Sequence, residues 1–411
     1  MVESLTLEHL QEAVHGPAAA FRCRRRLQPA GGEGSKVFPP TYAGGVYAVE
    51  QRRLPGFGDP VTCVLLDSVQ SQANRMEAAL QRAVDEGGIE LPLIEVDFTE
   101  ANQKLIKPID DRVTSLTVPH RLADAILRDS VVVEDGEDEG KLFRDTSYAE
   151  RWRRSSPANS TSIYELCPTA LVFGIWGAPE KPGGLGVKFQ RCITSEIVAI
   201  HAVTSDIRQG VRTDPLGIVR NASVVVKEDN RWENADASVT KSKRPSEINH
   251  GPILFGPSHG GATFSEAEQT GVLTLAGLRW LRFPPSGEKW KATNEQKKRD
   301  EAARTVLAAI GLTAASLAAE AGFDLRSGCL LHDSQAPTWE LVGRPGTGNG
   351  QFEVAAEEMT KTLRKAVKAA EAAGVSWRSE PLKLRPSDDL VELIRRSQEL
   401  AKKEGEEATD G

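Results

Sequence analysis

The stretch VTCVLLDSVQSQANRMEAALQRAV, residues 61–84, changes from a continuous apolar run to an amphipathic pattern. Residues 61–66 are apolar enough to form a buried β-strand. From Val69 onward apolar residues recur every three or four positions, which predicts a helix with one buried face. Asp67 or Ser68 can cap that helix by accepting a hydrogen bond from a first-turn N–H. The stretch therefore predicts a strand, a tight turn and a helix in succession.

The start of this helix is a candidate phosphate site, because free N–H groups and the positive end of the helix dipole attract anions. Its polar face carries Ser71, Gln72, Asn74 and Arg75. Asp67 at the cap would repel an anion, and the same pattern is also that of an ordinary β-α unit. Both interpretations stay open at this point.

Composition bounds the class of protein. A chain of 411 residues with 39% hydrophobic and 27% charged residues is typical of a soluble globular protein, with two or three domains or one large domain with insertions. We expect no apolar run of membrane-spanning length, and residues 1–10 are polar and acidic rather than a signal peptide. The sequence therefore predicts a cytoplasmic protein with no membrane partner.

The cysteines and charges narrow the possible functions. Five scattered cysteines, none in a C-x-x-C pair, indicate neither a disulfide framework nor a zinc site, and we expect no metal and no cofactor. The net charge of −7 argues against binding nucleic acid by bulk electrostatics. Residues 20–60 nevertheless hold seven Lys and Arg against three Asp and Glu, which predicts one basic surface on an acidic protein.

The rest of the chain gives a coarse order of elements. Strands are predicted over residues 21–27 and 47–53, and residues 99–160 read as a partly helical insertion outside the main sheet. A β-rich run at 169–176, a glycine-proline loop at 177–186 and a strand from 187 predict two joined strands with Lys181, Lys188 and Arg191 beside them.

Later segments favour a hairpin and then helices. Residues 219–227 and 237–243 are the predicted arms of a hairpin, and helical spacing follows at 269–282, 294–310 and 354–375. His120, His201 and His250 lack the spacing of a zinc or hydrolase signature. Residue chemistry alone thus predicts an α/β or α+β protein with a basic face and no catalytic constellation.

Five blocks, taken in order, resemble a CRISPR-associated family. They are SQANRMEAAL at 71–80, PTALVFGIW at 168–176, VKFQRCITSEIVAIHAV at 187–203, SEINHG at 246–251 and LAGLRWLRFP at 275–284. Their ordered co-occurrence is similar to the backbone subunit of the type I-G (formerly I-U) Cascade effector, a RAMP-superfamily protein that binds the spacer part of CRISPR RNA. The blocks span residues 22–284, and the remainder fits by length.

The resemblance implies an α+β, hand-shaped fold with a ferredoxin-like, RNA-recognition-like palm. The expected divisions are a palm over 1–98, 161–218 and 263–350, a finger-like insertion over 99–160, a thumb-like insertion over 219–262, and C-terminal helices and a tail over 351–411. It also implies head-to-tail copies along CRISPR RNA, pairing of the guide with target DNA, and three further partners. These are a repeat-binding and processing subunit, a large subunit and a recruited helicase-nuclease.

A subunit that binds any guide must hold phosphate and sugar rather than base edges, so arginine, lysine and small polar side chains suffice. We expect no enzymatic activity. Under the resemblance the candidate RNA-binding residues fall on two strands, one helix start and the base of the thumb; they are Arg22, Arg24, Arg26, Ser71, Gln72, Asn74, Arg75, Lys188, Arg191, Asn249 and His250. The three arginines of the first strand are expected to face the same groove as the helix start.

Two other functions stay open. A RAMP-type endoribonuclease acting on CRISPR RNA or target RNA would need a general acid or base beside the phosphate, and His120, His201 or His250 are the candidates. A scaffold without a nucleic-acid ligand would need neither.

Overall fold

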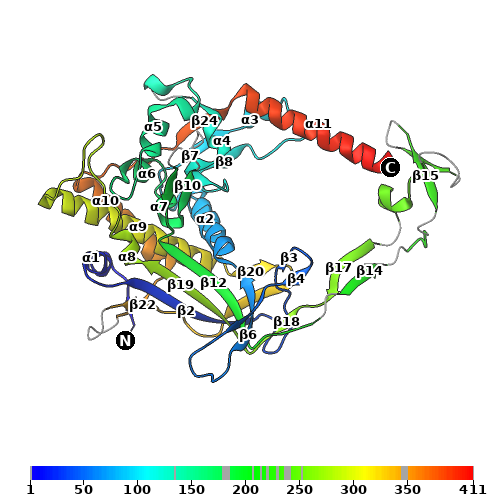
Figure 1. The fold of residues 1–411 in the computed structure, drawn as a ribbon, viewed down its shortest axis with the longest axis horizontal. Coiled ribbons are helices and arrows are strands. Elements are labelled where there is room, and N and C mark those ends of the chain that lie inside the picture. Colours follow the sequence, from blue (N-terminus) through cyan, green and yellow to red (C-terminus); the bar gives the residue numbers. More distant parts are fainter. Residues whose placement is uncertain are drawn as a thin grey trace.

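The computed structural model describes residues 2–133, 136–177, 186–205, 208–212, 215–218, 222–227, 231–235, 242–250, 253–343 and 350–410. The fold is α+β, as the sequence predicted. A large, mainly antiparallel sheet forms the lower part of Figure 1, with helices stacked above it and a second, smaller sheet at the top.

The large sheet has ten strands within the described residues. Its strand order is β1-β23-β22-β2-β19-β12-β6-β5, with β20 and β21 joined to it beside β2. The strands are β1 (Glu3–Ser4), β2 (Ala20–Pro29), β5 (Val49–Arg52), β6 (Val61–Asp67), β12 (Ile193–Ile200), β19 (Glu266–Thr274), β20 (Phe323–Arg326), β21 (Cys329–Asp333), β22 (Trp339–Val342) and β23 (Gln351–Glu353).

The centre of this sheet has ferredoxin-like connectivity. Two helices, α2 (Val69–Asp85) and α9 (Asn294–Glu320), separate the central strands along the chain, and β2 runs in the same direction as β12 and β19 in the same direction as β22. The chain passes from β2 through β5, β6 and α2 to β12, continues through an inserted arm to antiparallel β19, and returns through α9 to β22. The last strand thus lies beside the first, in the β-α-β-β-α-β arrangement of a ferredoxin-like unit.

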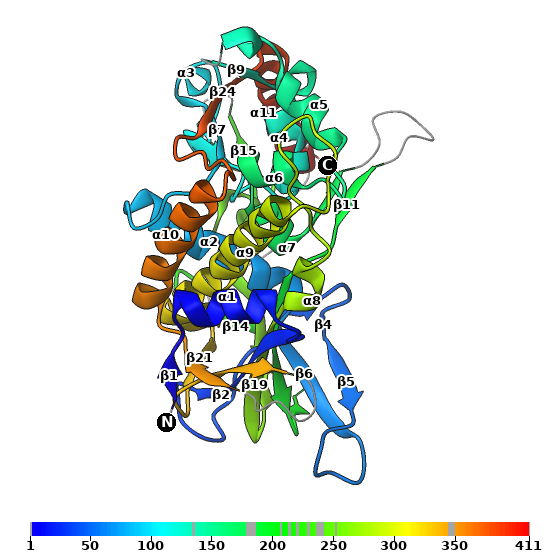
Figure 2. The ribbon, with the colours of Figure 1, turned by 90° about the vertical axis from the view of Figure 1, so that its left-hand side faces the viewer.

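Helices cover one face of the sheet, as Figures 1 and 2 show. They are α1 (Leu7–His15), α2, α8 (Leu275–Leu278), α9 and α10 (Ala356–Ala372). The predicted strand and helix over residues 61–84 are confirmed as β6 and α2, and Ser68 caps α2 by accepting from the Ser71 N–H at 3.2 Å.

Helix α9 is the core helix of this layer. Gly311 lets it approach β19 closely, since a Cβ there would lie 3.1 Å from Leu273 Cδ1. By length and composition alone α9 is apolar enough to cross a membrane, which corrects the expectation that no such run exists. Because 72% of its most apolar 18-residue stretch is buried inside the protein, packing in the core accounts for this apolar run.

A second sheet stands above the helices, with order β8-β7-β24-β9. Its strands are β7 (Ile94–Asp97), β8 (Arg112–Thr114), β9 (Ser130–Val132) and β24 (Leu382–Pro386). Short helices and the C-terminal helix surround it, namely α3 (Thr99–Asn102), η1 (Arg121–Ala123), α4 (Ala125–Arg128), η2 (Gly136–Asp138), η3 (Phe143–Asp145), α5 (Ser147–Arg153), α6 (Thr161–Leu166) and α11 (Asp388–Asp410). The segment 99–160 therefore lies outside the main sheet, as predicted, but a strand from near the C-terminus completes its sheet.

A long arm leaves the large sheet between β12 and β19 (Figure 1). Its base is β13 (Val203–Thr204) paired with β18 (Ala262–Thr263), and its shaft is β14 (Arg208–Arg212) paired with β17 (Ile253–His259). The far end carries the hairpin β15 (Ser223–Val226) and β16 (Trp232–Ala235), followed by η4 (Pro245–Ile248). The predicted hairpin arm 237–243 lies mostly outside the described residues.

Two small hairpins complete the fold. Strands β3 (Thr41–Tyr42) and β4 (Val46–Tyr47) pair within the glycine-rich loop. Strands β10 (Ile175–Gly177) and β11 (Val187–Phe189) pair beside α7 (Thr169–Phe173), and the loop between them, with Lys181, lies outside the described residues.

Two predicted elements were wrong in type. Residues 169–173 form the helix α7 rather than a strand, because every side chain in it is buried and the apolar run carries no periodicity. Residues 269–274 belong to strand β19 rather than to a helix, and only Leu275–Leu278 is helical.

Candidate nucleic-acid interface

The start of α2 is the leading sequence-based candidate for RNA contacts, and two of its four candidate side chains are bound within the protein. Gln72 is buried and donates to Asp67 Oδ2 at 2.5 Å. Arg75 donates to Asp67 Oδ2 at 3.0 Å and to the carbonyl oxygens of Asp324 and Leu325 at 3.2 and 2.6 Å. These two residues tie α2 to β6 and β20, whereas Asn74 is exposed and Ser71 half-buried.

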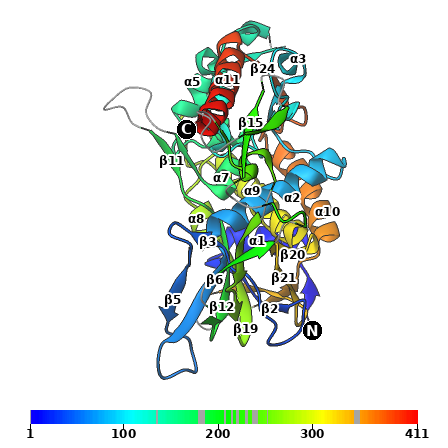
Figure 3. The same cartoon turned by 90° about the vertical axis from the view of Figure 1, so that its right-hand side faces the viewer.

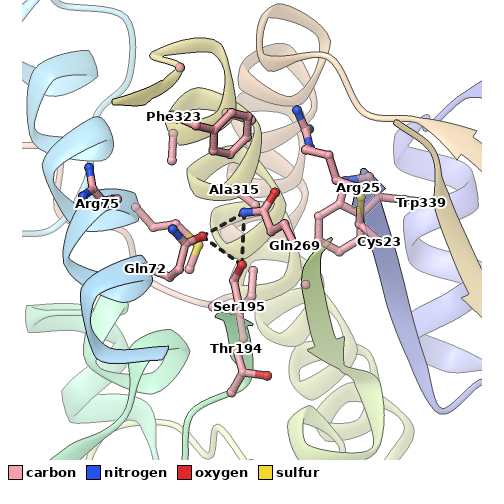
Figure 4. Close-up of a pocket in the computed structure, with 16 residues that line it drawn as sticks. Cys23, Arg25, Gln72, Arg75, Thr194, Ser195, Gln269, Ala315, Phe323 and Trp339 are labelled. Carbon is pink, nitrogen blue, oxygen red and sulfur yellow. Dashed lines mark hydrogen bonds between the residues drawn. The ribbon is translucent and has the colours of Figure 1, made fainter. Parts of the chain in front are cut away.

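Figure 4 shows the polar cluster beneath this helix. Ser195 Oγ donates to Gln72 Oε1 at 2.9 Å, and Gln269 Nε2 donates to the same oxygen at 2.8 Å. The adjoining cavity measures about 30 Å³, which is room for about one water molecule. The cluster is therefore a buried structural network and too small to hold a nucleotide.

The arginines of β2 point away from α2. Arg22, Arg24 and Arg26 alternate along the strand with the buried Cys23, Arg25 and Leu27. Residues directly opposite each other on neighbouring strands point to the same face of a sheet, and Cys23 lies opposite Gly271, which in turn lies opposite Ser195. Ser195 donates to Gln72 of α2, so Cys23, Arg25 and Leu27 are on the face that α2 covers. The expectation that Arg22, Arg24 and Arg26 share a groove with the helix start is thus wrong: strand alternation places them on the other face of the sheet.

Carboxylates compensate most of the charge on that other face. Arg22 pairs with Glu340 at 2.5 Å, and Arg26 lies 3.6 Å from Glu266. Arg24 is exposed and makes no ion pair with any residue that the structure describes. Of the three candidates on β2, Arg24 alone keeps an uncompensated charge.

An open pocket lies instead beside the β10–β11 hairpin. Its volume is about 280 Å³, and its lining includes Arg121, Phe173, Trp176, Lys188 and Arg191. Lys188 is exposed, and Arg191 is half-buried, with its Nε donating to the Phe173 carbonyl at 3.1 Å. Two predicted RNA-binding residues, Lys188 and Arg191, are thus brought together in one pocket.

Beneath this pocket lies a buried ion pair. Arg121 donates to both carboxylate oxygens of Glu77 at 2.6 and 2.7 Å, and to the Gly174 carbonyl at 3.1 Å. Burial raises the pKa of Glu77, against the opposing effect of Arg121. Burial, followed by the like charge of Arg121, lowers the pKa of Arg191.

The charge balance of this cluster favours an anion. Glu77 forms its ion pair with Arg121, and Arg191 has no ion-pair partner among the described residues, so its positive charge remains, and Lys188 adds another at the pocket surface. A phosphate group placed there would relieve the repulsion between the two guanidinium groups. The pocket is therefore suited to bind an anionic ligand.

Gly174 sets the shape of the pocket. Its φ of 84° and ψ of 155° lie in a region that glycine almost alone adopts. A Cβ at this position would lie 3.0 Å from Arg191 Cγ and 3.2 Å from the Phe189 carbonyl oxygen. The glycine thus allows the backbone to pass under Arg191.

The sequence did not single out Trp176, which is 73% exposed and lies directly across the hairpin from Lys188. Its place at the end of an apolar run predicts a buried side chain, so the sequence held no signal for an exposed ring. Arg121 was missed as well, because its partner Glu77 lies 44 residues away on another element.

The candidates of the thumb lie away from its base. His250 stacks edge-on against Trp232 of β16 at 5.6 Å, so it belongs to the far end of the arm. Asn249 ends η4 in the left-handed conformation, with φ 61°. The expectation that Asn249 and His250 lie at the base is therefore wrong, since the arm begins earlier, at the β13–β18 pair.

The candidate histidines lie in different surroundings. His120 is exposed and lines the basic pocket. His201 is exposed and packs against Phe57 at 4.7 Å. Within the described residues no three His, Cys, Asp or Glu side chains converge on a metal-sized site.

The cysteines are all buried and free. Burial raises the pKa of Cys192 and of Cys329 to about 12. These two thiols are therefore protonated near neutral pH and unsuited to act as nucleophiles.

Comparison with known proteins bears on this site. Among curated proteins none matches the chain. Residues 21–204 match the model of a family described as CRISPR-associated protein GSU0053 (Cas_GSU0053). The matched segment contains β2 from Phe21 onward, α2, Arg121, Lys188 and Arg191, and so the whole basic pocket. The match supports a CRISPR-associated protein with a role in CRISPR defence.

Proposed function

We propose that this protein is a non-catalytic, RNA-binding backbone subunit of a type I-G CRISPR effector. Copies would lie head to tail along the guide part of CRISPR RNA and present it for pairing with target DNA. The observation that carries the proposal is the basic pocket of Arg121, Lys188 and Arg191, which lies inside the segment similar to a CRISPR-associated family.

The pocket suits RNA of any sequence. Lys188 and Arg191 offer charge and N–H donors, which recognise phosphate but not base identity. A guide-binding subunit must bind RNA regardless of its sequence, since base pairing between guide and target carries the sequence information. Arg24, Ser71 and Asn74 remain candidates for further backbone contacts, because their side chains are not bound within the described protein.

The proposal assigns roles to the parts of the fold. The ferredoxin-like sheet and its helices serve as the palm, and the unit around the second sheet as the finger-like part. The arm between β13 and β18 serves as the thumb, which extends the predicted thumb toward lower residue numbers. The proposed partners are a repeat-binding and processing subunit, a large subunit and a helicase-nuclease, all in the cytoplasm.

The first test measures RNA affinity against salt. We expect Lys188→Ala and Arg191→Ala each to weaken binding of single-stranded RNA and to reduce the salt slope by about 0.7 for each phosphate that is no longer neutralised. Lys365→Ala is the matched control: Lys365 is an exposed lysine on α10, on the opposite side of the molecule from β11 in Figures 2 and 3. Equal slopes for all three variants and the wild type would contradict this binding site.

The second test addresses the assembly. The chain is coexpressed with a CRISPR array and the processing subunit, purified, and examined for particle mass and protected RNA. A large particle with RNA of guide length is expected. A monomer without RNA, under conditions where guide RNA is present, would count against the proposed role unless addition of the large subunit restored assembly.

One observation keeps the endoribonuclease alternative testable: His120 alone among the three candidate histidines lines the basic pocket. An imidazole beside a bound phosphate can act as general acid or base. Cleavage of labelled RNA by the purified protein, abolished in His120→Ala, would select the enzyme over the binding subunit.

A further inference from the structure

The β10–β11 hairpin has one buried face and one exposed face. Ile175 lies opposite Phe189, and Gly177 opposite Val187, and all four residues are buried. The alternation of side chains along a strand therefore turns Trp176 and Lys188, which lie opposite each other, to the outer face. Both are exposed, Trp176 by 73%.

The indole of Trp176 has no partner in the described protein. It makes no hydrogen bond, ring contact or cation–π contact with any residue that the structure describes. Yet it is held on a paired strand whose neighbouring side chains are packed, so the ring is carried by an ordered element. A large exposed ring fixed in this way indicates a contact surface.

The surroundings of Trp176 specify the ligand. The ring lines the same pocket as Lys188, Arg191 and His120. The volume of about 280 Å³ is near the lower end of pockets that hold small ligands, roughly 300 Å³, so one nucleotide is a fitting occupant. An aromatic face beside uncompensated positive charge is the combination that binds single-stranded nucleic acid through stacking and phosphate contact.

We propose that Trp176 stacks on one unpaired base of the bound RNA, while Lys188 and Arg191 hold an adjoining phosphate. This inference rests on the proposed RNA-binding function. Stacking is indifferent to base identity, because every base has a π face. It does require an unpaired base, so the pocket distinguishes single-stranded RNA from a duplex, whose bases are stacked on one another.

The test compares Trp176→Ala with Trp280→Ala. Trp280 is 77% exposed but does not line the pocket, so it controls for the loss of an exposed indole. We expect Trp176→Ala to weaken binding of single-stranded RNA roughly tenfold, and Trp280→Ala and Trp176→Phe to bind like the wild type. The salt slope of Trp176→Ala should stay unchanged, because a neutral ring releases no counterions, in contrast with Lys188→Ala.

Two further measurements keep the inference falsifiable if Trp176→Ala folds poorly. RNA carrying 5-iodouridine should crosslink to the wild-type protein in the peptide that contains Trp176. Binding of duplex RNA should be equal in the wild type and Trp176→Phe, and weaker than binding of the single strand.

The outcomes separate the two proposals. If the wild type binds RNA but Trp176→Ala binds equally well, or the crosslink falls only on other peptides, the stacking role is wrong and the RNA-binding function stands. If the wild type binds no RNA, in complex or alone, the proposed function fails and the stacking role with it.

Discussion

Gly174 is the residue on which the basic pocket depends most directly. A methyl group there would meet Arg191 Cγ at 3.0 Å, and the backbone conformation itself disfavours any other residue. We expect Gly174→Ala to lower the free energy of unfolding by about 1–3 kcal/mol and to weaken RNA binding, because Arg191 must move. Urea unfolding and RNA affinity measure the two effects.

Gly287→Ala is the matched control for this change. Gly287 also has a positive φ, 80°, but a Cβ there meets no atom within 4 Å. Gly287→Ala should therefore carry the cost of the positive φ but no steric clash, and it should leave RNA affinity unaltered. If Gly287→Ala were as destabilising as Gly174→Ala, the close packing under Arg191 would not be the cause.

Single residues also show what the sequence reveals and what it hides. Lys188 and Arg191 were predicted to lie beside the same glycine-proline loop because they are only three residues apart, on and just after the strand that follows it. Arg75 looked equally available, but its partners are carbonyl oxygens 249 and 250 residues further along the chain. No local sequence pattern predicts a contact over such a distance along the chain. The role of a basic residue on a polar helix face, as a ligand contact or a structural contact, therefore cannot be assigned until the fold is known.

Elements were predictable where one face is buried and the other exposed. Helix α2 has that pattern and was predicted correctly, whereas α7 is buried on all sides and its apolar run predicted a strand. Near the end of β19 the apolar residues Leu273, Ala276 and Trp280 have helical spacing, although Leu273 lies in β19, Ala276 in α8 and Trp280 after it. Tertiary burial, which periodicity does not report, decided both cases.

The arm is an element whose independence can be tested. Its strands β14 to β17 pair with one another and, through Val224, with Lys243 of the arm itself, and Ser205 N–H donates to the Gly261 carbonyl at its base. Replacing residues 206–260 by Asn-Gly closes this base with a two-residue turn. We expect the stability of the remaining fold to change by less than about 1 kcal/mol, since the removed loop closure costs little.

The same deletion separates binding from assembly. The basic pocket lies on the β10–β11 hairpin, so the shortened protein should still bind a short RNA, measured by fluorescence anisotropy. Under the proposed thumb role it should no longer form large particles on long RNA. Particles of full size from the shortened protein would contradict that role, and loss of soluble protein would contradict the independence of the arm.

At the scale of the whole molecule, the net charge of −7 is compatible with an anionic ligand because of where the charges lie. On the open face of the sheet Arg22 and Arg26 face Glu340 and Glu266, and Arg52 contacts Glu196 at 2.8 Å. Such pairing removes most of the basic character that residues 20–60 suggested. Apart from Arg24 on that face, positive charge without a carboxylate partner gathers in the pocket beside the hairpin, so a local site can attract RNA while the acidic net charge discourages nonspecific binding.

A head-to-tail backbone makes a quantitative prediction about mass. If each copy covers a fixed length of guide, the number of proteins bound to one RNA should increase in equal steps as the RNA is lengthened, since an interface that does not close on itself adds copies without limit. Mass photometry on a series of single-stranded RNAs measures this directly, with duplex RNA of the same lengths and the variant carrying both Lys188→Ala and Arg191→Ala as controls. A single copy bound at every length would contradict the filament, and steps that persist with the double variant would place the RNA contact outside the basic pocket.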